Sequence, residues 1–365
     1  MIATAFQRTS LGTVDKSAKT AVHVTGHLLS IDQTTFAVRA LHCYSNVAVQ
    51  RISRNSIKPT AKCHDRKVGV GDSKLSEIQV MQISAIQTSV QFADASNNLK
   101  LMSEIVMREA GHGSRLVIFP ECFTTGYCFD SKEEALAVAE EMRGPTVQAV
   151  CDLAQQAQCG IIFGMLEQRG DQLFNVAVLV GPDGIIGSYR KVHLPFLGVD
   201  RFTTHGDRPF EVFEFEGVKI GLLICYDGGF PEASRELALA GADLIALPTN
   251  WPRGAEYMSA FSVNSRAMEN GVYFAAVNRI GTENGFGFIG QSRIAGPYGE
   301  TLVHADHANE EILRTEISIE KARQKEITRV PGKHIIDRFA DRRPEMYGRI
   351  TEAHQLPFPG RPQTE

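Results

Sequence analysis

Apolar and polar residues follow an orderly pattern only from about Glu77 onward. Residues 78–87 alternate between apolar and polar side chains, which predicts a strand with one buried face. Residues 97–110 carry apolar side chains at helical spacing, which predicts an amphipathic helix. Residues 115–119 are an unbroken apolar run that is typical of a buried strand. The chain after Glu77 therefore begins with a predicted strand, helix and strand in succession.

Predicted helices and strands keep alternating as far as about residue 320. The further helices are predicted at 146–158, 231–240 and 256–270, and the further strands at 160–164, 173–180, 184–189, 218–224, 243–247 and 272–277. Residues 181–184 (GPDG) and 296–299 (GPYG) are turn sequences that predict hairpins. This alternation, with hairpins interspersed, predicts an α/β fold whose mixed sheet is covered by helices on its faces.

Two flanking segments differ from this middle part. Residues 1–76 are rich in Ser and Thr and carry more basic than acidic residues, while the remainder of the chain is acidic. They lack the continuous apolar stretch of a secretory signal and fit an organelle transit peptide only loosely. We expect a poorly ordered extension, or a start codon assigned too early, and assign it no function. Residues 77–320 form the predicted folded domain, and the proline-rich residues 321–365 a tail that lies on the core or on a partner subunit.

Composition narrows the class of protein. The chain is 43% hydrophobic and 22% charged, as in ordinary globular proteins, and it has no apolar run of the roughly 18 residues that a membrane helix needs. A net charge of −4 argues against a general nucleic-acid binder. Its seven cysteines form no C-x-x-C pair, so neither a zinc site nor a disulfide framework is expected. Reduced thiols in a cytoplasmic protein that does not enter a membrane are the simplest prediction.

A cysteine stands where a predicted strand gives way to a helix. Cys225 ends the apolar run 218–224, and Pro231 suits the first position of the next helix. Free N–H groups at a helix amino terminus favour an anion there, either a thiolate or an oxyanion. An ordinary thiol, with a pKa of about 8.5, needs such help to react at neutral pH. Taken alone, a buried structural cysteine remains the commoner interpretation.

Two more ionisable residues follow predicted strands. Glu121 comes directly after the apolar residues 115–119 and Pro120, and Lys191 follows the strand 184–189. Each alone could be a helix cap or a solvated charge. Functional residues of α/β proteins gather at the carboxyl ends of strands, so three such groups in one sheet indicate a reactive site.

Three motifs that contain these residues occur in a familiar order. IFPECFTTGY, YRKVHLPF and LLICYDGGFPE together resemble the nitrilase (carbon–nitrogen hydrolase) superfamily, whose signature is one Glu, one Lys and one Cys. The resemblance covers about residues 77–319, includes GADLIALPTNWP and SRAMENGVYF, and extends loosely to DRRPEMYG. It implies a four-layer αββα sandwich, a homodimer or larger assembly paired through helical faces, and chemistry that requires no metal or other cofactor.

The resemblance also implies a role for each motif residue. Glu121 would be the general base and acid, Lys191 the cation that stabilises the oxyanion, and Cys225 the nucleophile that forms a thioester. By analogy, the backbone N–H of Tyr226 would be a second oxyanion donor. Many members carry a second glutamate between the lysine and the cysteine, which this chain lacks. Asp200 could replace it, or it could pair with Arg201 or cap a turn.

Other residues near the strand ends are candidates for substrate binding. Tyr127 follows the glutamate motif, and Asn250 and Trp251 follow the strand after the cysteine, so their side chains could line an amide pocket together with Asp200 and Tyr226. Ordinary packing is the alternative, above all for Tyr127. The helical residues Arg266, Glu269 and Asn270 are expected to support the site structurally.

Three other signals are set aside. Residues 285–290 match G-x-G-x-x-G, but the following residues predict a strand and turn where a dinucleotide site needs a helix. His304 and His307, beside Asp306, fit a solvated hairpin edge better than a metal site. The chain lacks the G-x-S-x-G motif of the serine hydrolases.

These observations predict a cofactor-free amidase that acts on a small aliphatic amide, such as an ω-amide or an N-carbamoyl amine. It would release ammonia and a carboxylic acid. A nitrilase that uses the same Cys225 attack is the alternative activity. The rival class is a binding or regulatory protein that kept the fold without catalysing a reaction. A thiol redox protein is a third idea, but it would need a second, resolving cysteine, and no cysteine lies at a recognised spacing for that role.

Overall fold

The computed structural model describes residues 80–353, which lie within the compact unit Ser73–Glu365. The expectations for residues 1–76 and for the prolines after position 353 fall outside the described residues. Inside them, the fold consists of two six-stranded sheets and the helices that cover them.

The first sheet is mixed and has the strand order β14-β1-β2-β3-β4-β5. Strands β1, β2 and β3 are parallel, while β4 and β5 continue antiparallel from β3, and β14 lies antiparallel on the free edge of β1. The strands are β1 (Val80–Gln87), β2 (Leu116–Ile118), β3 (Gly160–Arg169), β4 (Gln172–Gly181), β5 (Gly184–Arg190) and β14 (Glu311–Ser318).

The second sheet has the same arrangement, in the order β13-β12-β9-β8-β7-β6. Its three central strands β7, β8 and β9 are parallel, and the outer strands are antiparallel to their neighbours. The strands are β6 (Val212–Phe215), β7 (Val218–Leu222), β8 (Leu244–Thr249), β9 (Tyr273–Asn278), β12 (Arg293–Ala295) and β13 (Thr301–His304).

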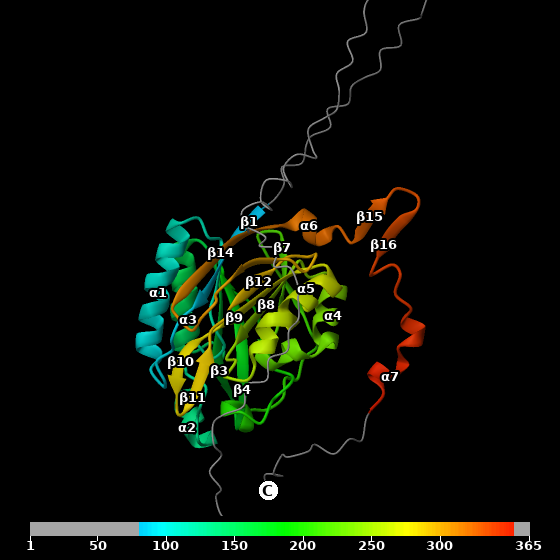
Figure 1. Ribbon diagram of the computed structural model, residues 1–365. Coiled ribbons are helices and arrows are strands. Elements are labelled where there is room, and N and C mark those ends of the chain that lie inside the picture. Colours follow the sequence, from blue (N-terminus) through cyan, green and yellow to red (C-terminus); the bar gives the residue numbers. More distant parts are fainter. Residues whose placement is uncertain (1–79, 354–365) are drawn as a thin grey trace, which may run out of the picture. The chain divides into compact units, whose positions relative to one another are not determined.

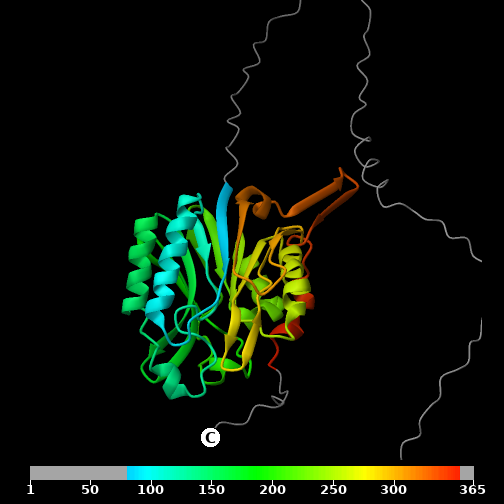
Figure 2. The ribbon, with the colours of Figure 1, turned by 60° about the vertical axis from the view of Figure 1, so that its left-hand side comes forward.

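Helices cover the outer face of each sheet (Figures 1 and 2). Helices α1 (Ala95–Gly111) and α3 (Pro145–Ala157) share a buried cluster with the outward side chains of the first sheet. Helices α4 (Pro231–Leu239) and α5 (Val263–Asn270) pack on the second sheet. The layers therefore follow the order αββα, as the family resemblance implied, with two mixed sheets where periodicity alone predicted one.

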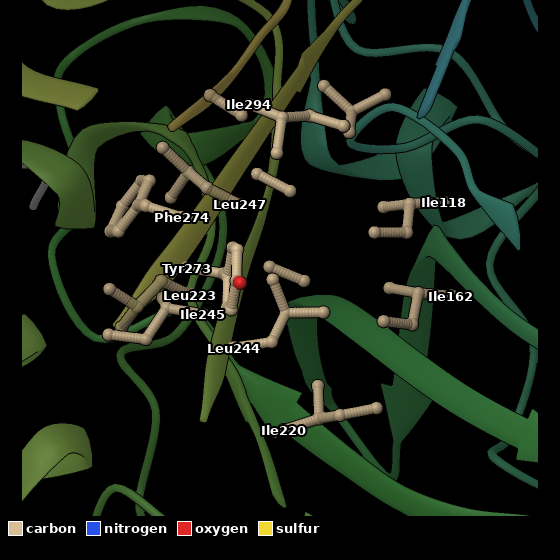
Figure 3. Packing of buried hydrophobic residues seen from close by; sticks show 14 of the residues in the cluster. Ile118, Ile162, Ile220, Leu223, Leu244, Ile245, Leu247, Tyr273, Phe274 and Ile294 are labelled. Carbon is tan, nitrogen blue, oxygen red and sulfur yellow. The ribbon is translucent and has the colours of Figure 1, made fainter. Parts of the chain in front are cut away.

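The inner faces of the two sheets pack against each other (Figure 3). Ile118 and Ile162 of the first sheet and Ile220 and Leu244 of the second are fully buried in one cluster. Burying a side chain of this size contributes about 1.5–3 kcal/mol. This interlocked core fixes the position of the strand ends, where the candidate chemistry lies.

The elements predicted from periodicity are confirmed within a few residues, including both hairpin turns. Strand β3 is longer than predicted because its polar end stays paired with β4. The predicted helix 256–270 begins with a π turn at Met258–Ser262. The sequence analysis missed several short or amphipathic elements. These are α2 (Lys132–Leu136), β6, β14 and the hairpin of β10 (Ile280–Glu283) with β11 (Phe286–Ile289).

The segment after residue 320 contains more regular structure than its sequence pattern indicates. Helix α6 (Ile319–Arg323) leads into β15 (Glu326–Val330) and β16 (His334–Asp337), which pair with each other. Phe339 packs against the core beneath the charged groups of Arg235 and Lys325. Two short turns follow, η4 (Pro344–Met346) and α7 (Gly348–Thr351). Between residues 80 and 353, no helix is long and apolar enough to span a membrane.

Candidate active site

The three chemical residues predicted from the sequence converge in the structure. Glu121 lies in the turn after β2, Lys191 directly follows β5, and Cys225 opens the 3-10 turn η2 (Cys225–Gly229) after β7. The Lys191 Nζ lies 2.8 Å from the Glu121 Oε1, and neither side chain is exposed. The Cys225 thiol is close enough to both groups for their charges to act on its pKa.

Glu121 is held by its backbone as well as by its side chain. The next residue, Cys122, has a left-handed φ of 48°, which turns the chain sharply at the end of the strand. At Gly164 of β3 a Cβ atom would lie 2.2 Å from the Cys122 N, so only glycine allows this approach. The Asn250 Nδ2 donates to the Glu121 backbone oxygen over 3.1 Å. The turn that presents the carboxylate is therefore rigid.

Lys191 is shared between two carboxylates. Besides Glu121, its Nζ lies 2.5 Å from the Asp200 Oδ2, and the Asp200 side chain is also unexposed. Asp200 belongs to the 3-10 turn η1 (Gly198–Arg201). Arg201 instead donates to the backbone oxygens of Gly198 and Phe129. Of the alternatives that the sequence left open, the structure has Asp200 in contact with the lysine.

An amide that sequence reasoning missed joins the two carboxylates. The Nδ2 of Asn175, on β4, donates to the Glu121 Oε1 over 2.7 Å and to the Asp200 Oδ1 over 3.0 Å. Lys191 also donates to the Glu121 Oε1. The second oxygen of this carboxylate, Oε2, is buried and has no hydrogen-bond partner among residues 80–353. The sequence signal that could have identified Asn175 is its position as the single polar residue in the apolar run 173–180.

The buried charges shift one another's proton affinity. Burial and the charge of Asp200 raise the pKa of Glu121, although Lys191 and Asn175 oppose the shift. Burial alone would lower the pKa of Lys191, but Asp200 and Glu121 outweigh it and hold that pKa well above its ordinary value. Lys191 therefore stays a cation, while Glu121 is a stronger base than an exposed glutamate.

Cys225 is protonated in the resting site. Burial raises the pKa of its thiol to about 12, with a further contribution from the charge of Glu121, while Lys191 acts in the opposite direction. The expectation that a helix terminus favours the thiolate is therefore wrong for this cysteine. Burial dominates, and α4 starts only at Pro231, beyond a five-residue turn. A nucleophilic role for this thiol would require a nearby base to accept its proton.

The turn that carries Cys225 is held from several sides. Cys225 has a φ of 46°, a conformation that costs a non-glycine residue about 1–3 kcal/mol. The buried Asp227 carboxylate accepts hydrogen bonds from the Ile224 N, the Tyr189 OH and the His193 N. Arg266, expected to be structural, donates to the backbone oxygens of Gly228 and Gly229. These contacts keep the strained thiol in place.

The predicted substrate-binding residues occupy different positions. Tyr127 is buried, and its hydroxyl donates to the Asp200 Oδ2 over 2.8 Å. Asn250 and Trp251 are also buried, and the Asn250 Oδ1 and the Trp251 Nε1 have no partner in the described part of the chain. Buried polar atoms normally have partners, so these two are available to a ligand. The Tyr226 side chain is 43% exposed and lies edge-on to Phe230.

The signals that were set aside have ordinary positions. Residues 286–289 form strand β11 and are followed by another strand, so no helix follows the glycine motif. His304 is exposed and pairs with Asp306. Within the described range, no group of His, Cys, Asp and Glu side chains could hold a metal ion.

Comparison with known proteins identifies the family. Residues 82–326 match the carbon–nitrogen hydrolase family. The chain belongs to this family. It is similar to a nitrilase from Pyrococcus abyssi, with 38% identity over 74% of this chain and 100% of the relative. It is 31% identical to an N-carbamoylputrescine amidase from Solanum lycopersicum, over 71% of this chain and 92% of the relative.

A solved structure agrees with this assignment. An amidase from Nesterenkonia sp. superposes with a TM-score of 0.62 and 25% identity, over 74% of this chain and 96% of that one. The protein is thus a carbon–nitrogen hydrolase of the amidase-like branch of the nitrilase superfamily.

Replacing Asp200 by Asn should shift the pH dependence of activity. The charge of Asp200 helps to raise the pKa of Glu121, so its removal lowers that pKa. Activity requires the ionised base, and the acid limb of kcat/KM should therefore move to lower pH, while kcat falls by about 10²-fold because Lys191 loses a partner. Hydrolysis rates measured across pH test this, and an acid limb that moves upward or stays in place would contradict it.

The Cys225 thiol should not titrate near neutral pH. Its pKa of about 12 predicts that the thiolate absorbance of the wild type, minus that of Cys225→Ser, stays flat up to about pH 10. Burial is the main cause of the raised pKa. Alkaline unfolding, which would expose the thiol, must therefore be excluded by circular dichroism of both samples. A difference signal that rises near the ordinary thiol pKa of about 8.5 would show that burial does not control this group.

Proposed function

We propose that the protein hydrolyses the C–N bond of a small aliphatic amide through a thioester on Cys225. The observation that carries this proposal is the free Oε2 of Glu121, a buried base of raised pKa beside a protonated thiol. Because the thiol does not ionise by itself, attack and proton transfer to Glu121 occur together.

The first half of the reaction forms the acyl-enzyme. The Cys225 sulfur attacks the amide carbonyl carbon while its proton passes to Glu121. The ammonium of Lys191 has three hydrogens, of which two face Glu121 and Asp200, and the third is available to the developing oxyanion. The backbone N–H of Tyr226 is the second proposed donor. When the C–N bond breaks, Glu121 returns the proton to nitrogen, and ammonia leaves.

The second half releases the acid. Glu121 accepts a proton from a water molecule, whose oxygen attacks the thioester carbonyl carbon. The C–S bond then breaks, the sulfur takes the proton back from Glu121, and the carboxylic acid departs. Asp200 and Asn175 take no part in bond making, since their contacts serve to hold Lys191 and Glu121 in place.

The substrate class follows from the residues around the thiol and from the relatives. Asn250 and Trp251 offer a carbonyl oxygen and an indole N–H that have no hydrogen-bond partner among residues 80–353, which suits the polar atoms of an amide. Relatives include the tomato N-carbamoylputrescine amidase and an (R)-stereoselective amidase from Pseudomonas sp. that is 34% identical. An ω-amide or an N-carbamoyl amine is therefore the proposed substrate, in a homodimer or larger homo-oligomer.

A nitrile is the second candidate substrate, because the Pyrococcus abyssi relative is called a nitrilase. Cys225 would attack the nitrile carbon to give a thioimidate, and water would convert the thioimidate to the thioester with release of ammonia. Product analysis with matched amides and nitriles of the same acyl chain separates the two activities. Turnover of the nitriles alone would favour the nitrilase.

Replacing Cys225 by Ala should abolish ammonia release from every amide in a panel of aliphatic and N-carbamoyl amides. A loss of at least about 10³-fold is expected because the nucleophile is removed. Cys151→Ala, which changes a cysteine on the outer helix α3, is the matched control and should keep wild-type rates. An active Cys225→Ala variant would exclude the mechanism. A binding or regulatory role would be favoured if the wild type hydrolyses no amide or nitrile and also fails to react with electrophilic probes.

A further inference from the structure

A second buried ion pair lies outside the catalytic cluster. Arg279, between β9 and β10, and Glu283, at the end of β10, are 1% and 4% exposed, and the Arg279 Nη1 lies 2.6 Å from the Glu283 Oε2. Taking two such charges out of water costs several kcal/mol for each ion. The contacts that the pair makes indicate what it does for the site.

Glu283 binds the backbone of the loop that follows Glu121. Its Oε1 accepts from two successive N–H groups, the Tyr127 N at 2.7 Å and the Cys128 N at 2.6 Å. The neighbouring Asn284 donates to the Cys128 oxygen over 2.8 Å. Gly126 has a φ of 83°, and a Cβ atom there would lie 2.8 Å from the Phe92 ring and 3.2 Å from the Glu283 Oε2, so glycine suits this position. The loop cannot shift without breaking both bonds to Oε1.

Arg279 holds Glu283 from the other side. Its Nη2 donates to the Val90 oxygen over 3.1 Å, and its guanidinium lies 4.4 Å from the centre of the Phe288 ring. Val90 and Phe288 thus fix the planar guanidinium, which presents Nη1 to the carboxylate. Glu283 therefore has one defined position in which it can accept both loop N–H groups.

Tyr127 connects this loop to the charged cluster of Glu121, Lys191 and Asp200. The phenol oxygen lies 2.8 Å from the Asp200 Oδ2 and 3.1 Å from the Leu197 oxygen, so these two acceptors share its single hydrogen, with Asp200 the nearer. The Val199 N donates to the Tyr127 backbone oxygen over 2.7 Å. A Cβ atom at Gly198 would lie 2.3 Å from the Tyr127 ring, so the two segments are closely packed. A displaced Tyr127 must move Asp200, and Asp200 contacts Lys191.

We propose that Glu283, held by Arg279, is a positioning residue for catalysis that fixes Tyr127 and, through its hydroxyl, Asp200 and the Lys191 ammonium. This inference rests on the proposed amide hydrolysis. Glu283 touches none of the reacting groups, so its removal changes the rate of the chemical step more than the binding of substrate. The hairpin of β10 and β11 thereby contributes to a site whose proposed reacting residues, Glu121, Lys191 and Cys225, lie on other elements.

The test combines Glu283→Ala and Glu283→Gln with Tyr127→Phe, which removes the hydroxyl at the end of the path. Displacement of a reacting group by about 1 Å costs about 10²-fold in rate, so we expect kcat of Glu283→Ala to fall by about 10²-fold, with KM changed by less than about threefold. Glu283→Gln keeps one acceptor oxygen for the loop and should recover part of the loss. In the Tyr127→Phe background, Glu283→Ala should lower kcat by no more than about twofold further.

Glu109→Gln is the matched control, because Glu109 is also a fully buried carboxylate that binds an arginine, Arg314, and a hydroxyl, that of Ser84. It should lower the melting temperature without changing kcat of the folded enzyme. If Glu283→Ala does not fold, the isosteric Glu283→Gln takes its place in both backgrounds, with a smaller expected loss of kcat that should again be absent in the Tyr127→Phe background.

The outcomes separate this inference from the proposed function. A wild type without amide turnover, or an active Cys225→Ala variant, contradicts the proposed function. An active wild type overturns the positioning role in either of two cases. In the first, the Glu283 variants keep the wild-type kcat once folded. In the second, their losses multiply fully with that of Tyr127→Phe, which would show that Glu283 does not act through the hydroxyl.

Discussion

The site depends on one buried ammonium shared between two buried carboxylates. Lys191 contacts Glu121 and Asp200, and all three side chains are withdrawn from water. Isolated charges of this kind cost several kcal/mol each, so each needs several partners at good geometry. Two negative groups for one positive group also leave an excess of negative charge. Burial, together with the charge of Asp200, raises the pKa of Glu121 against the effect of Lys191, and the two carboxylates hold the pKa of Lys191 high, as the proposed general base and oxyanion donor require.

The two-sheet architecture supplies the partners. Glu121, Lys191 and Cys225 each follow a strand, and the packed inner faces of the sheets bring those strand ends together. This much could be predicted from sequence, because a short apolar run followed by an ionisable residue is a local signal. Asn175 could be found only by its polarity in an apolar strand. Glu283 gave no such signal, since it stands in a polar stretch that resembles a surface turn.

Other features depend on burial, which periodicity does not measure. The thiol at Cys225 was expected to be favoured as an anion, whereas its complete enclosure raises its pKa to about 12. The contact of Asp200 with Lys191 likewise depends on burial and on the folded chain, so the sequence left Asp200 open between a substrate-positioning role and a capping role. Hairpins such as β10–β11 were missed although Asn284 and Gly285 are a strong turn signal. Gly285 also begins the G-x-G-x-x-G match at residues 285–290, so the same residues carry two patterns, of which the hairpin is the one that forms.

The most direct measurement of the central claim is mass spectrometry of the enzyme quenched in acid during turnover of an amide. The account predicts one covalent adduct with the mass of the acyl group, located on the peptide that contains Cys225. The adduct should accumulate when deacylation is slowed and disappear when substrate is exhausted. Steady ammonia release with an unmodified Cys225 at every time point, or an acyl group on another residue, would contradict it.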